Sequence, residues 1–79
     1  MARSPDPIQI VSELVASVAE VSVAVGDEVP AGGIVALLES MKMEIPLLTE
    51  RAGRVTDVRV SAGDVVQDGD ILVVIQPTD

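Results

Sequence analysis

Two stretches of the sequence repeat each other and decide the fold. Residues 23–39 read VAVGDEVPAGGIVALLE, and residues 60–76 read VSAGDVVQDGDILVVIQ. When the alignment is extended to residues 8–39 and 45–76, ten of the 32 aligned pairs are identical. The Gly-Asp pairs that begin at Gly26 and Gly63 recur at the same place, which chance matches between valines would not produce. Two units are too few for a solenoid, so the sequence predicts two interlocked halves related by a quasi-two-fold axis.

Each half is predicted to consist of short strands. Turns rich in glycine and aspartate interrupt the apolar runs at close intervals. Hydrophobic residues make up 48% of the chain and include no aromatic residue, so valine, isoleucine and leucine must build the core, which favours strands. Residues 11–22 also have helical spacing, but their repeat partner, residues 48–60, contains Gly53 and alternates like a strand. We therefore expect strands in both places and an all-β fold.

Length and composition exclude several classes of protein. Seventy-nine residues form one domain. Cysteine and histidine are absent, which excludes disulfides, thiolate nucleophiles, and metal sites made of thiolates or imidazoles. The net charge of −8 repels the phosphates of nucleic acids. No apolar run is long enough to span a membrane, and the first residues do not resemble a signal peptide. We expect a cytoplasmic monomer without nucleic-acid or membrane partners.

One lysine occupies a special place in the repeat. Lys42 is the only lysine, and the other four basic residues are arginines. It lies in the linker between the halves, from Ser40 to Glu44. A two-fold relation places this linker at the end of the molecule opposite Pro7 and Pro77. The sequence therefore predicts that Lys42 is displayed at the tip of a tight hairpin.

The surroundings of Lys42 suggest a role beyond solubility, which is the ordinary interpretation of a surface lysine. Met41 and Met43 flank it where a turn would favour Asn, Asp, Gly or Ser, and exposed methionines suit an adaptable partner surface. A Schiff-base lysine needs burial or cationic neighbours, whereas Glu39 and Glu44 favour the charged ammonium. We therefore expect a separate enzyme to dock on the tip and attach a group to the lysine.

The residues around the lysine resemble a known motif. Glu39-Ser40-Met41-Lys42-Met43 is similar to the Glu-Ala/Ser-Met-Lys-Met attachment motif of biotinyl domains, which belong to the biotin/lipoyl attachment family. The family's Val-x-x-Gly-Asp-x-Val repeat pattern stands on both sides, and the resemblance covers residues 18–75. It implies a flattened β-barrel, or sandwich, of two four-stranded antiparallel sheets with the modified lysine on a hairpin. We place this domain at residues 8–76, with flexible tails at residues 1–7 and 77–79.

The resemblance implies a carrier and not an enzyme. A biotin protein ligase would join biotin to Lys42 through an amide bond, using ATP. The attached biotin, as carboxybiotin, would carry a carboxyl group between a biotin carboxylase and a carboxyltransferase. Glu39, Met41, Met43 and Glu44 are the expected recognition residues for partners.

Two alternatives to the biotin carrier remain. One is a lipoyl carrier, although lipoyl domains usually have Asp-Lys-Ala at this hairpin. The other is an unmodified interaction module that uses the Met-rich tip.

The chain departs from the family pattern at two places. Many biotinyl domains carry an Ala-Pro-Met-Pro-Gly stretch where this chain has residues 12–16, so a partner contact is expected to differ. Residues 26–33 are too few for the inserted thumb that covers biotin in some carriers, so we expect exposed biotin. Because the resemblance covers most of the chain, we expect a protein similar to the small stand-alone biotinyl proteins.

Other charged residues are expected to serve the fold and its solubility. Four aspartates lack the spacing of an EF-hand and are expected in turns: Asp27, Asp64, Asp68 and Asp70. Three arginines are expected to alternate on the outer face of one strand and balance the acidic surface: Arg51, Arg54 and Arg59.

Overall fold

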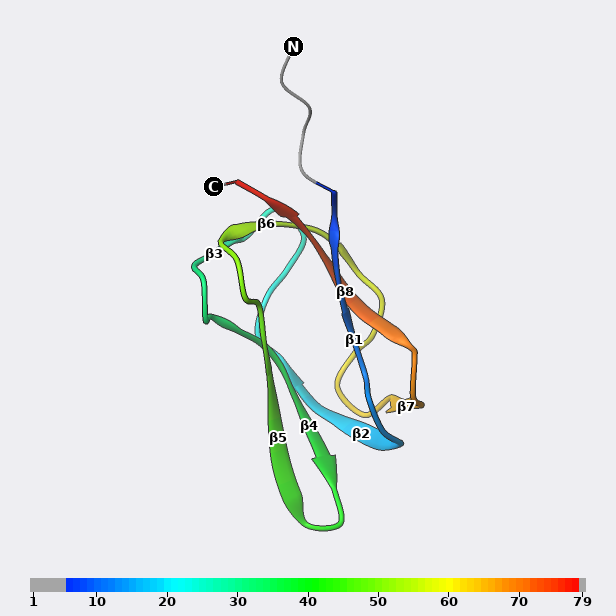
Figure 1. Cartoon of the computed structure of the whole chain (residues 1–79). Helices are drawn as coiled ribbons and strands as arrows, with labels where there is room; N and C mark the ends of the chain where they lie inside the picture. The colour runs from blue at the N-terminus through cyan, green and yellow to red at the C-terminus, as the bar shows by residue number, and fades with distance from the viewer. Residues whose placement is uncertain (1–5, 79) are drawn as a thin grey trace.

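The computed structural model describes residues 6–78 of the chain, and these form two four-stranded antiparallel sheets (Figure 1). One sheet has the strand order β1-β8-β6-β3 and the other has the order β5-β4-β2-β7. The predicted all-β architecture is confirmed. The strands are β1 (Ile8–Val11), β2 (Ala16–Val21), β3 (Glu28–Val29), β4 (Ile34–Ser40), β5 (Met43–Leu48), β6 (Gly53–Val58), β7 (Val65–Val66) and β8 (Ile71–Pro77).

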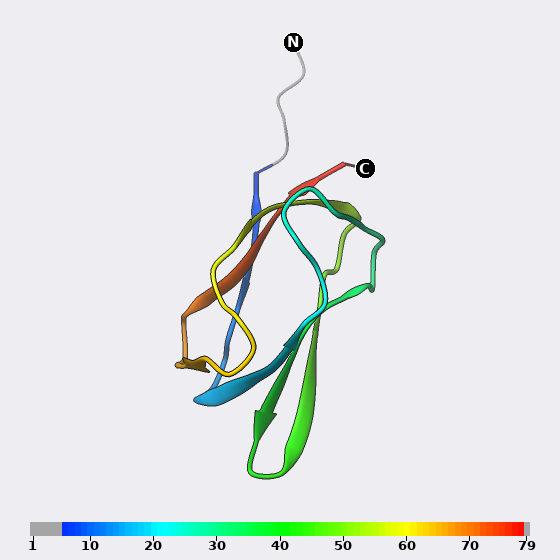
Figure 2. The same cartoon turned by 180° about the vertical axis from the view of Figure 1, so that it is seen from behind.

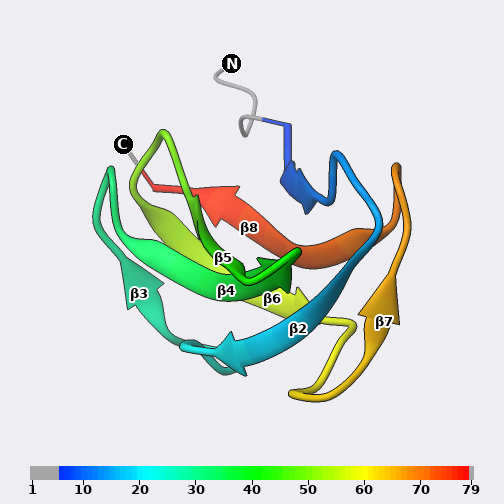
Figure 3. The ribbon, with the colours of Figure 1, turned by 90° about the horizontal axis from the view of Figure 1, so that it is seen from below.

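The two halves of the chain interlock as the repeat predicted. Adding 37 to the residue numbers of β1 to β4 gives residues of β5 to β8, and the same operation converts one sheet order into the other. Hydrogen bonds between the halves occur in matching pairs: the N–H of Val18 donates to the carbonyl of Asp64, and that of Val55 to the carbonyl of Asp27, both at 2.8 Å. Seen along the long axis, β3 and β7 lie on opposite flanks (Figure 3). Each half thus completes the other's sheet.

The core lies between the two sheets and is entirely aliphatic. The stretch with helical spacing forms β2, where Ala16 and Val18 are buried and Ser17 between them is exposed. This alternation is the pattern of a strand with one buried face, so the preference for strand over helix is confirmed. The described residues contain no helix long and apolar enough to cross a membrane. The buried hydrophobic residues are Ala16, Val18, Val29, Val35, Ala36, Leu38, Val55, Val66, Leu72, Val73 and Ile75.

The β4–β5 hairpin lies at the end of the molecule opposite the start of β1 and the end of β8 (Figures 1 and 2). β8 continues to Pro77, and the N–H of Thr78 donates to the carbonyl of Ala52 at 3.1 Å. Ordered structure therefore extends past the expected domain boundary at residue 76. Residues 1–5 and 79 of the expected tails lie outside the described residues.

The aspartates and arginines of the turns have separate roles. Three of the four aspartates accept a hydrogen bond from the backbone N–H three residues earlier, and these bonds are Asp27 with Ala24, Asp64 with Ser61, and Asp70 with Gln67. These three carboxylates build turns, as expected. The expectation that three arginines share one strand face is wrong, because β6 begins at Gly53 and ends at Val58. Only Arg54 lies in that strand; Arg51 precedes it, and Arg59 follows it and pairs through Nε with Asp57 Oδ2 at 2.7 Å.

Candidate functional site

The β4–β5 hairpin closes with a loop of two residues, Met41 and Lys42. Ser40 pairs with Met43 as the last pair of the two strands. Met41 has φ 52° and Lys42 has φ 66°, and positive φ at both central residues is the property of a type I′ turn. Residues with a Cβ pay about 1 kcal/mol for this conformation, so the paired strands hold the turn in place.

Lys42 stands at the tip with its amine open to solvent. Its side chain is exposed, and it makes no hydrogen bond or ion pair within residues 6–78. Met41 is 92% exposed and Met43 is 64% exposed. The predicted display of the lysine between two exposed methionines is therefore what the structure shows. A macromolecule can reach the amine without any rearrangement of the barrel.

Close to its tip, the hairpin is hydrogen-bonded to the turn between β1 and β2. The hydroxyl of Ser40 donates to the carbonyl of Val15 at 3.3 Å, and the Val15 side chain is 65% exposed. This turn belongs to residues 12–16, where the sequence departs from the biotinyl pattern. The structure thus places that departure beside the lysine hairpin. Sequence reasoning recognised the departure but not its position, which depends on the pairing of β2 with β4.

Glu39 and Glu44 face each other across the hairpin. They form a register pair between β4 and β5, and both are exposed. Like charges directly opposite each other in a sheet destabilise the pairing. The structure therefore brings all five predicted site residues to one end of the molecule: Glu39, Met41, Lys42, Met43 and Glu44.

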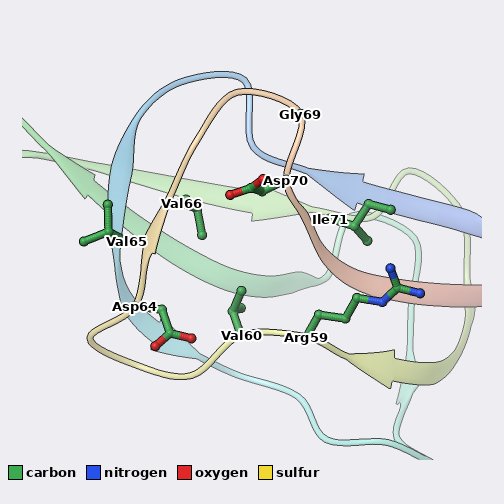
Figure 4. Close-up of a pocket in the computed structure, with 8 residues that line it drawn as sticks. All are labelled: Arg59, Val60, Asp64, Val65, Val66, Gly69, Asp70 and Ile71. Atoms are coloured by element: carbon green, nitrogen blue, oxygen red, sulfur yellow. The ribbon is translucent and has the colours of Figure 1, made fainter.

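A pocket beside β7 is built around polar groups that already have partners (Figure 4). The carboxylates of Asp64 and Asp70 accept hydrogen bonds from the backbone N–H groups of Ser61 and Gln67, respectively. The pocket is therefore a consequence of two turns that approach each other. Its lining residues are Arg59, Val60, Asp64, Val65, Val66, Gly69, Asp70 and Ile71.

A second hollow lies between the edge strands β1 and β5, along the side of the barrel. Its lining is mainly aliphatic, and Glu50 and Arg51 lie at the end remote from the hairpin. No residue of the hairpin tip lines this groove, so it forms no part of the lysine site. Its apolar lining residues are Ile8, Ile10, Val11, Leu14, Ile45, Leu47 and Leu48.

Comparison of the sequence with known proteins identifies relatives whose names describe them as biotinylated proteins. The profile of the Biotin_lipoyl family, described as "Biotin-requiring enzyme", matches residues 2–75. The "Biotinylated protein TB7.3 homolog" of Mycobacterium leprae is 57% identical over 42 residues, which cover 53% of this chain and 59% of that protein. The aligned region thus spans less than two thirds of that relative's length.

Comparison with solved structures gives the same fold. A single-chain, multi-domain long-chain acyl-CoA carboxylase matches all of this chain with a TM-score of 0.86 and 35% identity, over 8% of its own length. The lipoyl domain of the 2-oxoglutarate dehydrogenase complex from Azotobacter vinelandii matches 82% of this chain and 82% of its own length, with a TM-score of 0.72 and 22% identity. At that identity, the second likeness shows the fold alone.

Proposed function

Because the chain belongs to the biotin/lipoyl attachment family, whose profile it matches over residues 2–75, we propose that it is a biotin carrier with Lys42 as the attachment residue. The observation that carries the proposal is the only lysine of the chain, exposed between Met41 and Met43 at the tip of a type I′ turn. An amide bond to biotin requires an accessible primary amine, and the Lys42 side chain provides one.

Attachment of biotin needs an enzyme that activates the biotin carboxyl group. In the proposed reaction, a biotin protein ligase would join the biotin carboxylate to the α-phosphate of ATP, which forms biotinyl-adenylate and releases pyrophosphate. The Lys42 amine, after loss of a proton, attacks the acyl carbon, the amide bond forms and AMP leaves. Glu39 and Glu44 lie on either side of the turn, where an approaching ligase would meet them. We propose that these two carboxylates and the methionines are read by partner enzymes.

The attached biotin supplies a ureido group that accepts and releases a carboxyl group. We propose that the chain carries this carboxyl group between a biotin carboxylase and a carboxyltransferase, which act in trans in the cytoplasm. The chain has no histidine or cysteine, so neither general-acid work by imidazole nor thiolate chemistry can come from its own side chains. A carrier of this kind needs a rigid body, so that the tethered group reaches both active sites at high effective concentration.

A lipoyl carrier is the second candidate, because the same fold occurs in the lipoyl domain with the TM-score of 0.72. The methionines on both sides of Lys42 favour biotin, since lipoyl domains usually carry Asp-Lys-Ala there. A biotin carrier and a lipoyl carrier require different ligases. The two ligases attach groups of different chemistry to the Lys42 amine.

The experiment that tests the proposal offers both ligases to the purified chain. With ATP and equal concentrations of biotin and lipoate, we expect the parent protein to bind streptavidin after treatment with a biotin protein ligase and to remain unlabelled by a lipoate ligase. Lys42→Arg keeps the positive charge and should abolish capture. Addition of a biotin carboxylase, ATP and radiolabelled bicarbonate should then label the biotinylated protein only. Attachment of lipoate but not of biotin would contradict the biotin carrier and support the lipoyl carrier.

A further inference from the structure

The side chains that oxidants attack most readily are confined to the lysine hairpin in the part of the chain that the structure describes. The sequence contains no cysteine, histidine, tryptophan or tyrosine. Of the three methionines, only Met41 and Met43 fall within residues 6–78, and they stand on either side of Lys42. An oxidant that reaches this part of the protein therefore finds its sulfur targets beside the lysine.

Both thioethers are open to solvent and lie outside the core. Met41 is 92% exposed and Met43 is 64% exposed. Neither belongs to the core or to the half-buried side chains that pack against it. The core itself is built from alanine, valine, leucine and isoleucine, which offer a peroxide no group to oxidise. Oxidation would therefore change the hairpin tip and leave the packing of the barrel intact.

The oxidation of each thioether needs only hydrogen peroxide. A lone pair of the sulfur attacks one peroxide oxygen, an S–O bond forms, the O–O bond breaks, and a proton transfer releases water. The sulfur is oxidised to a sulfoxide and the peroxide is reduced. Hydrogen peroxide is uncharged, so neither the net charge of −8 nor the carboxylates of Glu39 and Glu44 repel it.

The position of the two thioethers connects their oxidation to the attached group. Consecutive Cα atoms are about 3.8 Å apart, so Met41 and Met43 accompany Lys42 into any active site that receives the group it carries. An apolar thioether adapts to such a surface. A sulfoxide in the same place is polar, and its burial without a hydrogen-bond partner costs binding free energy.

We propose that Met41 and Met43 form a site of reversible oxidation, and that their sulfoxides weaken the contact between the hairpin tip and the carboxylase that acts on the attached biotin. The inference rests on the proposed function, which makes Lys42 the biotin attachment residue. Met41 is oxidised first, because it is the more exposed of the two. A dithiol-dependent methionine sulfoxide reductase reverses the change: the sulfoxide oxygen leaves as water, the dithiol becomes a disulfide, and the thioether returns.

The experiment oxidises the full chain before biotin is attached, because biotin itself contains a thioether. After the peroxide is removed, excess biotin protein ligase, ATP and biotin are supplied, and streptavidin capture gives the biotinylated fraction. A biotin carboxylase and radiolabelled bicarbonate then give rates per biotinylated chain. We expect one added oxygen on each of Met41 and Met43, and kcat/KM about tenfold below that of the untreated parent through a higher KM. Methionine sulfoxide reductases that act on both sulfoxide epimers should restore the rate.

Two variants show whether the loss comes from these two sulfurs. The double variant Met41→Leu, Met43→Leu lacks both thioethers, and peroxide should leave its rate at the value of its own untreated sample. Val25→Met in this background is the matched control. Val25 is 62% exposed and lies on the connection between β2 and β3, at the end of the molecule remote from the hairpin (Figure 2). The added methionine should take up oxygen without any loss of rate.

The possible outcomes separate the oxidation site from the function on which it rests. A parent that takes up both oxygens and keeps its kcat/KM would overturn the oxidation site while leaving the biotin carrier in place. An equal loss in the parent and in the double leucine variant, or a loss that the reductases do not reverse, would overturn it too. Thermal unfolding of treated and untreated samples verifies that the barrel is intact. An untreated parent that accepts no biotin would overturn the biotin carrier and this inference with it.

Discussion

At the scale of single residues, the hairpin tip has a backbone conformation that its two residue types do not favour. Type I′ turns favour Asn-Gly, yet this turn uses Met41 and Lys42 with φ of 52° and 66°. The sequence motif around Lys42 predicted its display at the tip. It could not predict the positive φ values, because methionine and lysine do not prefer that conformation and the strand pairing imposes it.

The strain at the tip predicts a stabilising substitution. Asparagine tolerates positive φ better than methionine, so Met41→Asn should raise the free energy of unfolding by about 0.5 kcal/mol. Met43→Asn is the matched control, since Met43 begins β5 and asparagine is disfavoured in strands. Urea unfolding of both variants measures the difference. A lower stability for Met41→Asn than for Met43→Asn would show that the turn conformation stores no strain.

At the scale of the elements, the repeat was sufficient to predict strands in both halves, including the stretch with helical spacing. Glycines and aspartates marked the turns, and Asp27, Asp64 and Asp70 accept the turn hydrogen bonds. The register between strands far apart in the sequence could not be predicted, because it depends on packing between the sheets. The partnership of Ser17 with both Glu39 and Val65 therefore became visible only in the structure.

Substitutions at Ala16 and Gly53, which are equivalent positions in the repeat, test how tightly the strands pack. A Cβ on Gly53 would lie 2.6 Å from the carbonyl oxygen of Gln76 and also clash with the Ile75 side chain. Gly53→Ala should therefore lower the free energy of unfolding by about 1–3 kcal/mol through overpacking. Ala16→Gly, the reverse change at the equivalent position, should cost only about 1 kcal/mol. Equal effects in urea unfolding would contradict the close approach at Gly53.

At the scale of the whole molecule, the two halves share one core. A core substitution in either half should therefore lower the free energy of unfolding of the whole molecule. Leu38 and Ile75 are equivalent in the repeat, and both side chains are fully buried. Leu38→Ala and Ile75→Ala should each lower the free energy of unfolding by about 3 kcal/mol, in a single cooperative transition. Denaturation followed by two different probes tests this expectation. Two separate transitions, or a loss confined to one variant, would argue against a common core.

The excess of acidic residues affects the stability of the whole chain. A net charge of −8 on 79 residues produces self-repulsion in the compact state. Salt screens this repulsion, so the melting temperature should rise by a few degrees between about 0.05 M and about 0.5 M sodium chloride. A scan of melting temperature against salt provides the measurement. A fall over this range would mean that attractive surface pairs outweigh the repulsion.

The most direct test of the carrier assignment is the intact mass of the chain after incubation with biotin protein ligase, ATP and biotin. The account predicts a mass increase of one biotinyl group, located on the peptide that contains Lys42, and no increase in Lys42→Arg. Because Lys42 is the only lysine, no other side-chain amine can substitute for it. An unmodified parent protein, or the same increase in Lys42→Arg, would contradict the account.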